Sequence, residues 1–250
     1  MAESPHSLAG KTALVTGAAK RLGRRMALAL AQQGAQVLVH YHRSQAEASQ
    51  VLEEIQQQRG TAYLVQADLS QASQAESLLA RARALAGPID ILINNASVFK
   101  EQTLWQTTET SLQANMQIHA YAPLVLARSL ASQDRPGHII NLLDSRVQDY
   151  DQQHLPYHLS KRTLLCLTRI LALELAPTIA VNAIAPGLIL PPEGQDDQYL
   201  ERLAHTNPLQ RYGHPQDIVA AMLFLLRSEF ISGQIIYVDG GRHMKGQVYE

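Results

Sequence analysis

Short apolar segments alternate with longer helical patterns along almost the whole of this chain. The apolar segments are residues 12–16, 35–40, 61–65, 89–94, 138–143, 179–184 and 235–238, and they are continuously apolar, as strands covered on both faces are. Helical patterns lie between these segments at 21–33, 45–60, 107–131, 155–175 and 215–227, and another, between 61–65 and 89–94, stops before Gly87-Pro88. This alternation predicts an α/β fold with a single doubly wound parallel sheet and helices on both faces.

One connection between a predicted strand and the next helix is unusually long. Residues 188–212 separate a predicted strand from the next helix, whereas such connections usually take about two to six residues. The insertion follows the carboxyl end of a strand, which is the edge where ligands bind in open α/β sheets. Since no break in composition divides the 250 residues, we expect one domain, 1–250, with a substrate loop at about 188–212.

Composition excludes several classes of function. The net charge is −1, with 46% hydrophobic and 17% charged residues, so we expect neither nucleic-acid nor membrane binding. The first ten residues lack the apolar core of a secretion signal, and no run of about eighteen apolar residues follows. The single cysteine, Cys166, forms no internal disulfide and offers no thiol cluster for a metal. We therefore expect a cytoplasmic protein.

A glycine turn lies between the first strand and the first helix. It reads TGxxxRxG from Thr16 to Gly23. Glycine there lets the backbone approach a pyrophosphate, whose charge the helix N-terminus stabilises. The turn therefore favours a dinucleotide cofactor, contacted by Gly17, Lys20, Arg21, Leu22 and Gly23.

The end of the second strand indicates which dinucleotide. A free ribose hydroxyl is usually met there by Asp or Glu, but residues 40–44 read HYHRS, and the first acid is Glu47. A guanidinium such as that of Arg43 suits a 2′-phosphate, so NADPH is favoured over NADH; a solvated basic loop is the alternative. Ser44 and Glu47 also have the spacing of a capping box for the next helix.

Tyr157 and Lys161 are four residues apart, which places a phenol and an ammonium on one face of a helix. A nearby cation favours the ionised phenol, so we expect Lys161 to lower the pKa of Tyr157 and make it a useful acid. Taken alone, such a pair is more often a half-buried aromatic beside a solvated amine.

The helix at 155–175 is apolar nearly all round, because seven of its apolar residues cannot share one face: Leu164, Leu165, Leu167, Ile170, Leu171, Leu173 and Leu175. We expect one side to face the sheet and the other a second subunit. Burial by its own chain is the alternative. His154 and His158 have metal-ligand spacing, but Pro156 intervenes and no third ligand is evident, so we expect no metal.

Several motifs together resemble the short-chain dehydrogenase/reductase family. They are TGxxxRxG, Ala67-Asp68-Leu69, Asn94-Asn95-Ala96, Tyr157 with Lys161, Asn182 and Pro186-Gly187, in that order over essentially the whole chain. The resemblance implies a Rossmann-type subunit, usually tetrameric, with Asp68 near the adenine and Lys161 on the nicotinamide ribose. The cofactor-binding residues expected in total are Gly17, Lys20, Arg21, Leu22, Gly23, His40, Tyr41, His42, Arg43, Ser44, Asp68, Leu69, Asn94, Ala96, Tyr157, Lys161, Pro186, Gly187 and Leu188.

Departures from the family pattern indicate a branch. Asp144 stands thirteen residues before the tyrosine, where a serine is usual, and Ser145 is one position late. His119 replaces the usual asparagine, and Ser97 the glycine after Asn-Asn-Ala. These residues resemble the pteridine reductases and dihydromonapterin reductases. Whether His119 takes part in a proton path or only packs is open.

The branch resemblance implies a pterin or folate substrate. Reduction of its C=N bond needs a proton on nitrogen, which Asp144 could relay through Tyr157, and Phe99 could stack on the flat ring. We thus expect catalytic Asp144, Tyr157 and Lys161, and a substrate site of Arg21, Ser97, Phe99, Asp144 and Tyr157. The predicted enzyme is an NADPH-dependent pteridine reductase that converts dihydromonapterin, dihydrobiopterin or dihydrofolate to the tetrahydro form. The alternatives are an NADPH-dependent carbonyl reductase, such as a 3-oxoacyl thioester reductase using Ser145, and a non-catalytic NADPH-sensing regulatory protein.

Overall fold

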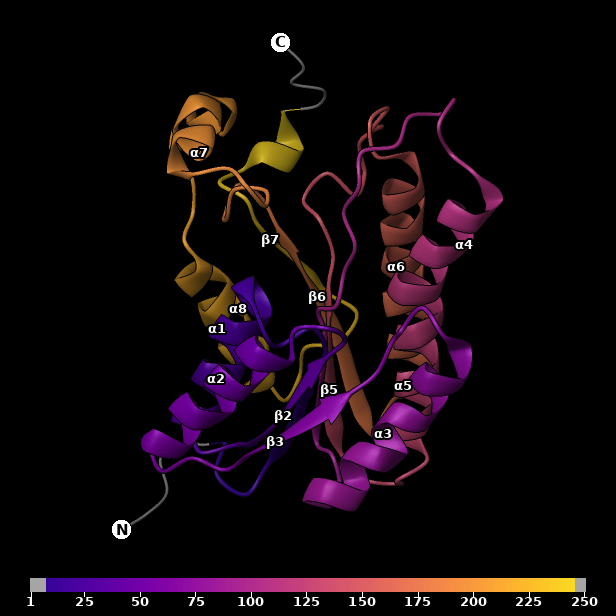
Figure 1. Ribbon diagram of the computed structural model, residues 1–250, viewed down its shortest axis with the longest axis vertical. Helices are drawn as coiled ribbons and strands as arrows, with labels where there is room; N and C mark the ends of the chain where they lie inside the picture. Colours follow the sequence, from indigo (N-terminus) through magenta and orange to yellow (C-terminus); the bar gives the residue numbers. More distant parts are fainter. Residues whose placement is uncertain (1–7, 246–250) are drawn as a thin grey trace.

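The computed structural model of the chain describes residues 8–245. Within them seven strands form one parallel sheet in the order β3-β2-β1-β4-β5-β6-β7, which confirms the predicted fold class (Figure 1). The strands are β1 (Thr12–Val15), β2 (Gln36–Tyr41), β3 (Ala62–Gln66), β4 (Ile91–Asn94), β5 (Gly137–Leu142), β6 (Ile179–Pro186) and β7 (Ile235–Val238).

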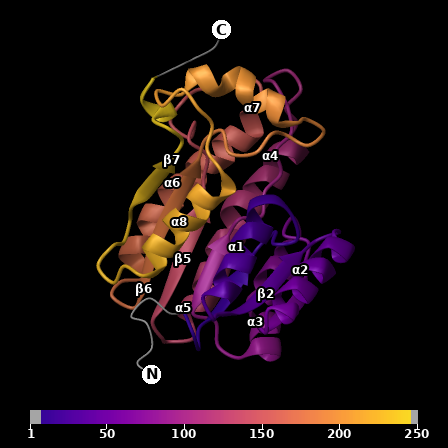
Figure 2. The same ribbon diagram turned by 90° about the vertical axis from the view of Figure 1, so that its left-hand side faces the viewer.

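Helices cover both faces of the sheet (Figures 1 and 2). One layer consists of α1 (Arg21–Gln32), α2 (Gln45–Gln57) and α8 (Pro215–Leu226). The other consists of α3 (Ala72–Ala86), α4 (Glu109–Met116), α5 (Ala122–Ala131) and α6 (Leu155–Glu174). Short 3-10 turns occupy Ala204–Thr206 and Arg242–Met244.

The two faces of the sheet are packed by alternating residues of the same strands. Leu14 is level with Leu38 and Leu92 in neighbouring strands, and all three lie fully buried in the cluster that includes α3 and α5. The next residue, Val15, belongs instead to the cluster that includes α1 and α8. Because successive side chains of a strand point to opposite faces, a sheet buried on both sides needs the continuous apolar runs seen in the sequence.

The helix expected at 107–131 is present as the unbroken helical segment 109–131, in which a π-helical turn, Gln117–Tyr121, joins α4 to α5. Such turns insert one extra residue and often occur at functional sites. One local prediction was wrong. The capping box of Ser44 and Glu47 is absent, since Ser44 makes no side-chain cap on α2. The carboxylate of Glu47 pairs with Lys20 at 2.8 Å instead.

The insertion at 188–212 contains a short helix, α7 (Asp197–Leu203), and the 3-10 turn that follows it. Figure 1 shows α7 beyond the upper ends of β6 and β7, which are the carboxyl ends of the strands. No helix within 8–245 has the length and hydropathy to cross a bilayer. The prediction that no leader precedes the fold falls largely on residues 1–7, outside the described range.

Candidate active site

Asp144, Tyr157 and Lys161 lie together where β5 ends and α6 begins. The phenol of Tyr157 donates to Oδ2 of Asp144 at 2.9 Å. Nζ of Lys161, one helical turn further, is 5.7 Å from the centroid of the tyrosine ring and donates to the carbonyl of Leu142 at 2.7 Å. The structure thus brings the three predicted catalytic residues into one cluster.

The effect of this cluster on Tyr157 is opposite to the expected one. The side chain is only 8% exposed, and burial, followed by the negative charge of Asp144 and the hydrogen bond to it, raises the pKa of Tyr157 well above 10.0. Lys161 does not reverse this, although its ammonium is 5.7 Å from the centroid of the tyrosine ring. Tyr157 therefore holds its proton at neutral pH and is available as a proton donor.

Lys161 is 3% exposed. Burial lowers its pKa from 10.5 to about 8, although the charge of Asp144 opposes the change. The ammonium is therefore the main species at neutral pH, and a modest rise in pH removes it.

The loop between β5 and α6 is fixed to α6 by Arg162. Its Nε donates to the carbonyl of Val147 at 2.9 Å, and its Nη2 to those of Gln148 and Asp149 at 2.6 and 2.7 Å. At the start of the loop, the backbone N–H of Arg146 donates to Oδ1 of Asp144 at 2.8 Å. The position of the Asp144 carboxylate is thus set by the loop backbone, a feature the sequence analysis missed.

Phe99 follows β4 and stands beside Tyr157. The two rings are edge to face, with centroids 4.7 Å apart and an interplanar angle of 83°. His154 stacks on Phe99 at 4.2 Å and 14°, and the backbones of Gln102 and His154 form an isolated parallel bridge. Phe99 remains 53% exposed, so it presents apolar ring surface next to the phenol of Tyr157.

The other predicted substrate residues are on the same side of the sheet edge. Ser97 lies between β4 and Phe99, and its hydroxyl is 2.9 Å from Nε2 of His119. Arg21 begins α1 with a positive φ of 51°, and its guanidinium donates to the carbonyl of Pro191 at 2.6 Å. Arg21 therefore connects the glycine turn with the 188–212 insertion.

The glycine turn is closely packed. Gly17 has a φ of 62°, and a Cβ on Gly23 would lie 2.1 Å from the carbonyl oxygen of Gly17. The side chain of Asn95 donates to the carbonyls of Thr16 and Gly17 at 2.9 and 3.1 Å, so the segment after β4 holds the turn after β1. Asn95 therefore positions this turn, a role that the Asn94-Asn95-Ala96 motif alone did not predict.

His40 is buried under the same turn. Its Nδ1 accepts from the backbone N–H of Gly17 at 3.0 Å, and its Nε2 is 3.2 Å from the carbonyl of Ala67. Burial lowers the pKa of His40 from 6.5 to about 4, although the contact with Ala67 opposes the change. The neutral ring therefore supports the turn backbone. Leu22 packs against the apolar core beside it.

Basic side chains gather beyond β2. His42 and Arg43 follow Tyr41, the last residue of the strand, and Nε2 of His42 is 3.5 Å from Oδ2 of Asp68. Burial opposes ionisation of Asp68, but hydrogen bonds from Ser70 and the nearby charges of His42 and Arg43 outweigh it and lower its pKa. Arg43 and Lys20, the N-cap residue of α1, are cations on the side of the turn where a phosphate-bearing ribose is expected.

The remaining predicted cofactor residues border the same edge. Leu69, Asn94, Ala96 and Lys161 line a small cavity of about 10 Å³, and Oδ1 of Asn94 is buried without a hydrogen-bond partner in the described part of the chain. Pro186 accepts from the backbone N–H of Ser145 at 2.9 Å. Gly187 donates to Val238 at 3.0 Å, and Leu188 accepts from Gly213 at 2.9 Å.

These residues fit a nicotinamide dinucleotide. The turn itself, residues 17–23, contains no acidic residue, and the carboxylate of Glu47 beside it is paired with Lys20. The orphaned Asn94 oxygen and Lys161 belong to the residues that line the small cavity. A metal ion finds no comparable donor set, since no group of three His, Cys, Asp or Glu side chains within 8–245 could hold one. His154 instead pairs with Asp151 at 3.1 Å.

Comparison with known proteins agrees with this geometry. A family model described as Enoyl-(Acyl carrier protein) reductase matches residues 17–243. The 3-oxoacyl-(acyl-carrier-protein) reductase FabG of Staphylococcus aureus (strain Mu50 / ATCC 700699) is 31% identical, with 94% of this chain and 98% of that protein covered. A short-chain type dehydrogenase/reductase of Picea abies is also 31% identical, with 94% and 93% covered.

Two solved structures are similar over nearly the full chain. FolM alternative dihydrofolate reductase 1 from Brucella canis, complexed with NADP, has a TM-score of 0.91 and 34% identity, with 98% of each chain covered. The Brucella suis protein of the same description, also with NADP, has a TM-score of 0.90 and 35% identity, with 96% and 97% covered. On the strength of these matches and of the site geometry, the chain belongs to the short-chain dehydrogenase/reductase family of oxidoreductases.

Proposed function

We propose that this protein is an NADPH-dependent pteridine reductase that converts a dihydropterin, such as dihydromonapterin, dihydrobiopterin or dihydrofolate, to its tetrahydro form. The observation that carries the proposal is the 2.9 Å hydrogen bond from Tyr157 to Asp144. A carboxyl beside the catalytic phenol suits a C=N bond, whose nitrogen must gain a proton, better than it suits a ketone, whose oxygen needs a neutral donor.

Tyr157 is the proton donor in this proposal. Its raised pKa keeps the phenol protonated. Asp144 accepts the hydrogen bond of the phenol, so after transfer it would take up a proton from solvent and pass it to Tyr157. Lys161 keeps a positive charge beside the ring and would hold the nicotinamide ribose. A bound NADPH would supply the hydride.

The cofactor assignment rests on the basic residues beyond β2. Arg43 and His42 suit a 2′-phosphate, and the similar Brucella structures contain NADP. The flat, half-exposed ring of Phe99 suits a pterin stacked over the nicotinamide. Ser97 and Arg21 border the place where the polar edge of the pterin would lie.

A 3-oxoacyl thioester reductase is the competing function, since the FabG relatives carry that description. It would need a neutral hydroxyl at the reacting oxygen, but Asp144 and not Ser145 contacts the phenol, and Ser145 is 3% exposed. A non-catalytic NADPH sensor is the third possibility. The assembled cluster of Tyr157 and Lys161 argues against it.

The direct test is NADPH oxidation by the purified protein with dihydromonapterin, dihydrobiopterin, dihydrofolate and an acetoacetyl thioester in parallel. We expect turnover of at least one dihydropterin with kcat/KM at least tenfold above that of the thioester. Turnover of the thioester alone would establish the carbonyl reductase. No turnover of any substrate, with tight NADPH binding, would favour the sensor.

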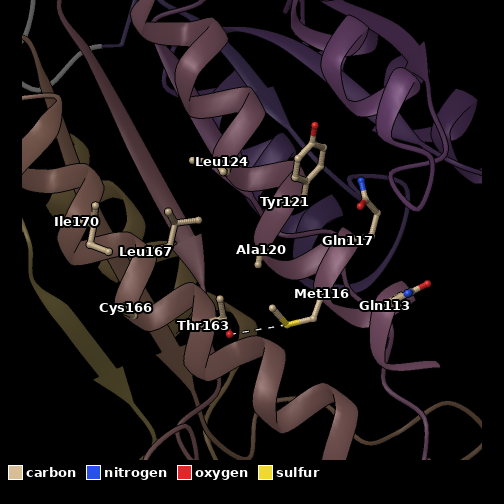
Figure 3. A pocket seen from close by; sticks show the side chains of 10 residues that line it. All are labelled: Gln113, Met116, Gln117, Ala120, Tyr121, Leu124, Thr163, Cys166, Leu167 and Ile170. Carbon is tan, nitrogen blue, oxygen red and sulfur yellow. Dashed lines mark hydrogen bonds between the residues drawn. The ribbon is translucent and has the colours of Figure 1, made fainter. Parts of the chain in front are cut away.

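We also propose a homotetramer in the cytoplasm. A largely apolar cavity of about 530 Å³ lies between α4, the turn Gln117–Tyr121, α5 and α6 (Figure 3), and Asp144, Tyr157 and Lys161 are not among its lining residues. Ile170 on its border and Leu173 on the same helix are 49% and 81% exposed, which suits a covered surface. The molar mass from light scattering after size exclusion should correspond to four chains for the wild type and to fewer chains for Ile170→Glu. A molar mass of one chain for the wild type would contradict the proposal.

A further inference from the structure

His119 occupies an unusual position in the fold. It lies in the π-helical turn Gln117–Tyr121 and is only 1% exposed. Its ring faces that of Tyr157 edge to face, with centroids 5.5 Å apart. The mechanism described above assigns no role to this buried polar side chain.

The hydrogen bonds around Nδ1 of His119 define the protonation of the ring. Nδ1 is 2.7 Å from the hydroxyl of Ser160, and that hydroxyl donates its single proton to the carbonyl of Tyr157 at 2.7 Å. Ser160 can therefore only accept from the histidine. Nδ1 must carry a proton.

The hydrogen bonds around Nε2 lead to the same tautomer. The backbone N–H of Val98 donates to Nε2 at 3.3 Å, so Nε2 presents its lone pair. Burial, followed by the charge of Lys161, lowers the pKa of His119 well below 6.5, so the ring stays neutral. Two backbone groups, at Tyr157 and Val98, thus independently fix the neutral ring with its proton on Nδ1.

This tautomer orients the hydroxyl of Ser97. Its Oγ is 2.9 Å from Nε2 of His119. An unprotonated Nε2 can only accept, so the serine donates to its single lone pair and shares it with the more distant N–H of Val98 at 3.3 Å. With its proton directed inward, the oxygen has only lone pairs left for the exposed side, where Ser97 borders the substrate site. Unlike a freely rotating serine, Ser97 cannot donate to a ligand.

We propose that His119 is a positioning residue that makes Ser97 an obligate hydrogen-bond acceptor, so that the site selects a ring with an N–H group at that point and rejects one with a carbonyl. This inference rests on the proposed function, since it specifies the substrate. A pterin carries an exocyclic amino group on its pyrimidine ring. A lumazine has the same two rings with a carbonyl at that position, so its oxygen would face the oxygen of Ser97 unpaired.

The first test reads the tautomer without any substrate. Long-range proton–nitrogen NMR correlations of the histidine rings distinguish a proton on Nδ1 from one on Nε2, and His119→Phe identifies the signal. We expect Nδ1 protonated and no titration of this ring between pH 6 and 8. A proton on Nε2, or a charged ring in this range, would overturn the proposal.

The second test compares dihydropterin with dihydrolumazine. We expect the wild type to prefer dihydropterin about tenfold or more in kcat/KM, as one unpaired polar group in a site costs. Ser97→Ala should bring the ratio near one, and so should His119→Phe, because the freed serine hydroxyl can then donate to the carbonyl. The KM for NADPH should stay within about twofold in both variants.

Each outcome has a separate meaning. If His119→Phe keeps the wild-type ratio of kcat/KM for dihydropterin over dihydrolumazine, the positioning role is refuted. If His119→Phe unfolds the protein, the Ser97→Ala variant, at an exposed position, still tests the role of the serine. If the wild type reduces neither ring, the proposed function fails and the role of Ser97 in pterin selection fails with it. The NMR result then still tests the geometry of His119.

Discussion

Both oxygens of the Asp144 carboxylate are engaged, and Tyr157 contacts only one of them. The phenol donates to Oδ2 at 2.9 Å, while the backbone N–H of Arg146 donates to Oδ1 at 2.8 Å. The orientation of the carboxylate toward the phenol therefore depends on the loop that follows β5. Catalysis should be sensitive to residues that hold this loop, even where they do not contact substrate.

Arg162 is the residue to test for this dependence. Its three hydrogen bonds to loop carbonyls are lost in Arg162→Ala, so we expect about 2 kcal/mol less free energy of unfolding in urea and a kcat reduced roughly tenfold. Arg25→Ala, at an exposed position on α1, is the control and should change neither value. Wild-type kcat in Arg162→Ala would show that the loop holds its position without the clamp.

Arg43 should determine the choice of dinucleotide. Loss of a guanidinium from a phosphate costs about 1.5–3 kcal/mol, so Arg43→Ala should raise the KM for NADPH at least about tenfold and leave that for NADH unchanged. Steady-state kinetics with both cofactors measure the ratio. Arg59→Ala, at an exposed position in the turn after α2, is the matched control. An unchanged ratio in Arg43→Ala would mean that the 2′-phosphate is bound elsewhere.

The lowered pKa of Lys161 predicts an alkaline limit on activity. Because its value is about 8 and not 10.5, the ammonium is lost as pH rises through about 8. The kcat/KM, which reports groups of the free enzyme, should fall above that pH. Tyr157 does not interfere, since its own pKa is raised well above 10.0. A pH profile flat to pH 10 would contradict the shift.

His40 should make the fold sensitive to acid. Its pKa is about 4 when folded and 6.5 in the unfolded chain, so the unfolded state binds more protons between these values. The stability it contributes is complete above pH 6.5 and falls by roughly 3 kcal/mol as pH drops through 4. Urea unfolding at pH 7 and pH 4.5 measures the loss. His40→Gln, which can keep both hydrogen bonds, should show a smaller loss, and an equal loss would assign it to other groups.

The sheet could be predicted from sequence because a strand buried on both faces is a continuous run of apolar residues. Val15 and Leu14 face opposite layers, and both must be apolar, so the strand is visible without its neighbours. The motif residues of the site could be located for a similar reason, since they follow strand ends that a parallel sheet brings to one edge.

Other features depend on contacts between distant segments. Glu47 was assigned to a local cap, but Lys20, far away in sequence, takes its carboxylate. The pKa of Tyr157 was predicted with the wrong sign because burial outweighs a nearby cation, and burial of one side chain is not encoded in a four-residue spacing. The network of His119 joins segments 22 and 41 residues apart, which no local pattern reveals.

The most direct test of the account is the effect of Asp144→Ser on two substrates of the same preparation. We expect kcat for a dihydropterin to fall about 100-fold, the usual scale for loss of a group that assists proton transfer. The dissociation constant for NADPH should be unchanged, and thioester turnover should not fall. Asp144→Asn, which keeps the shape of the side chain, should lose as much. Dihydropterin turnover at the wild-type rate in both variants would contradict the central role of the contact between Asp144 and Tyr157.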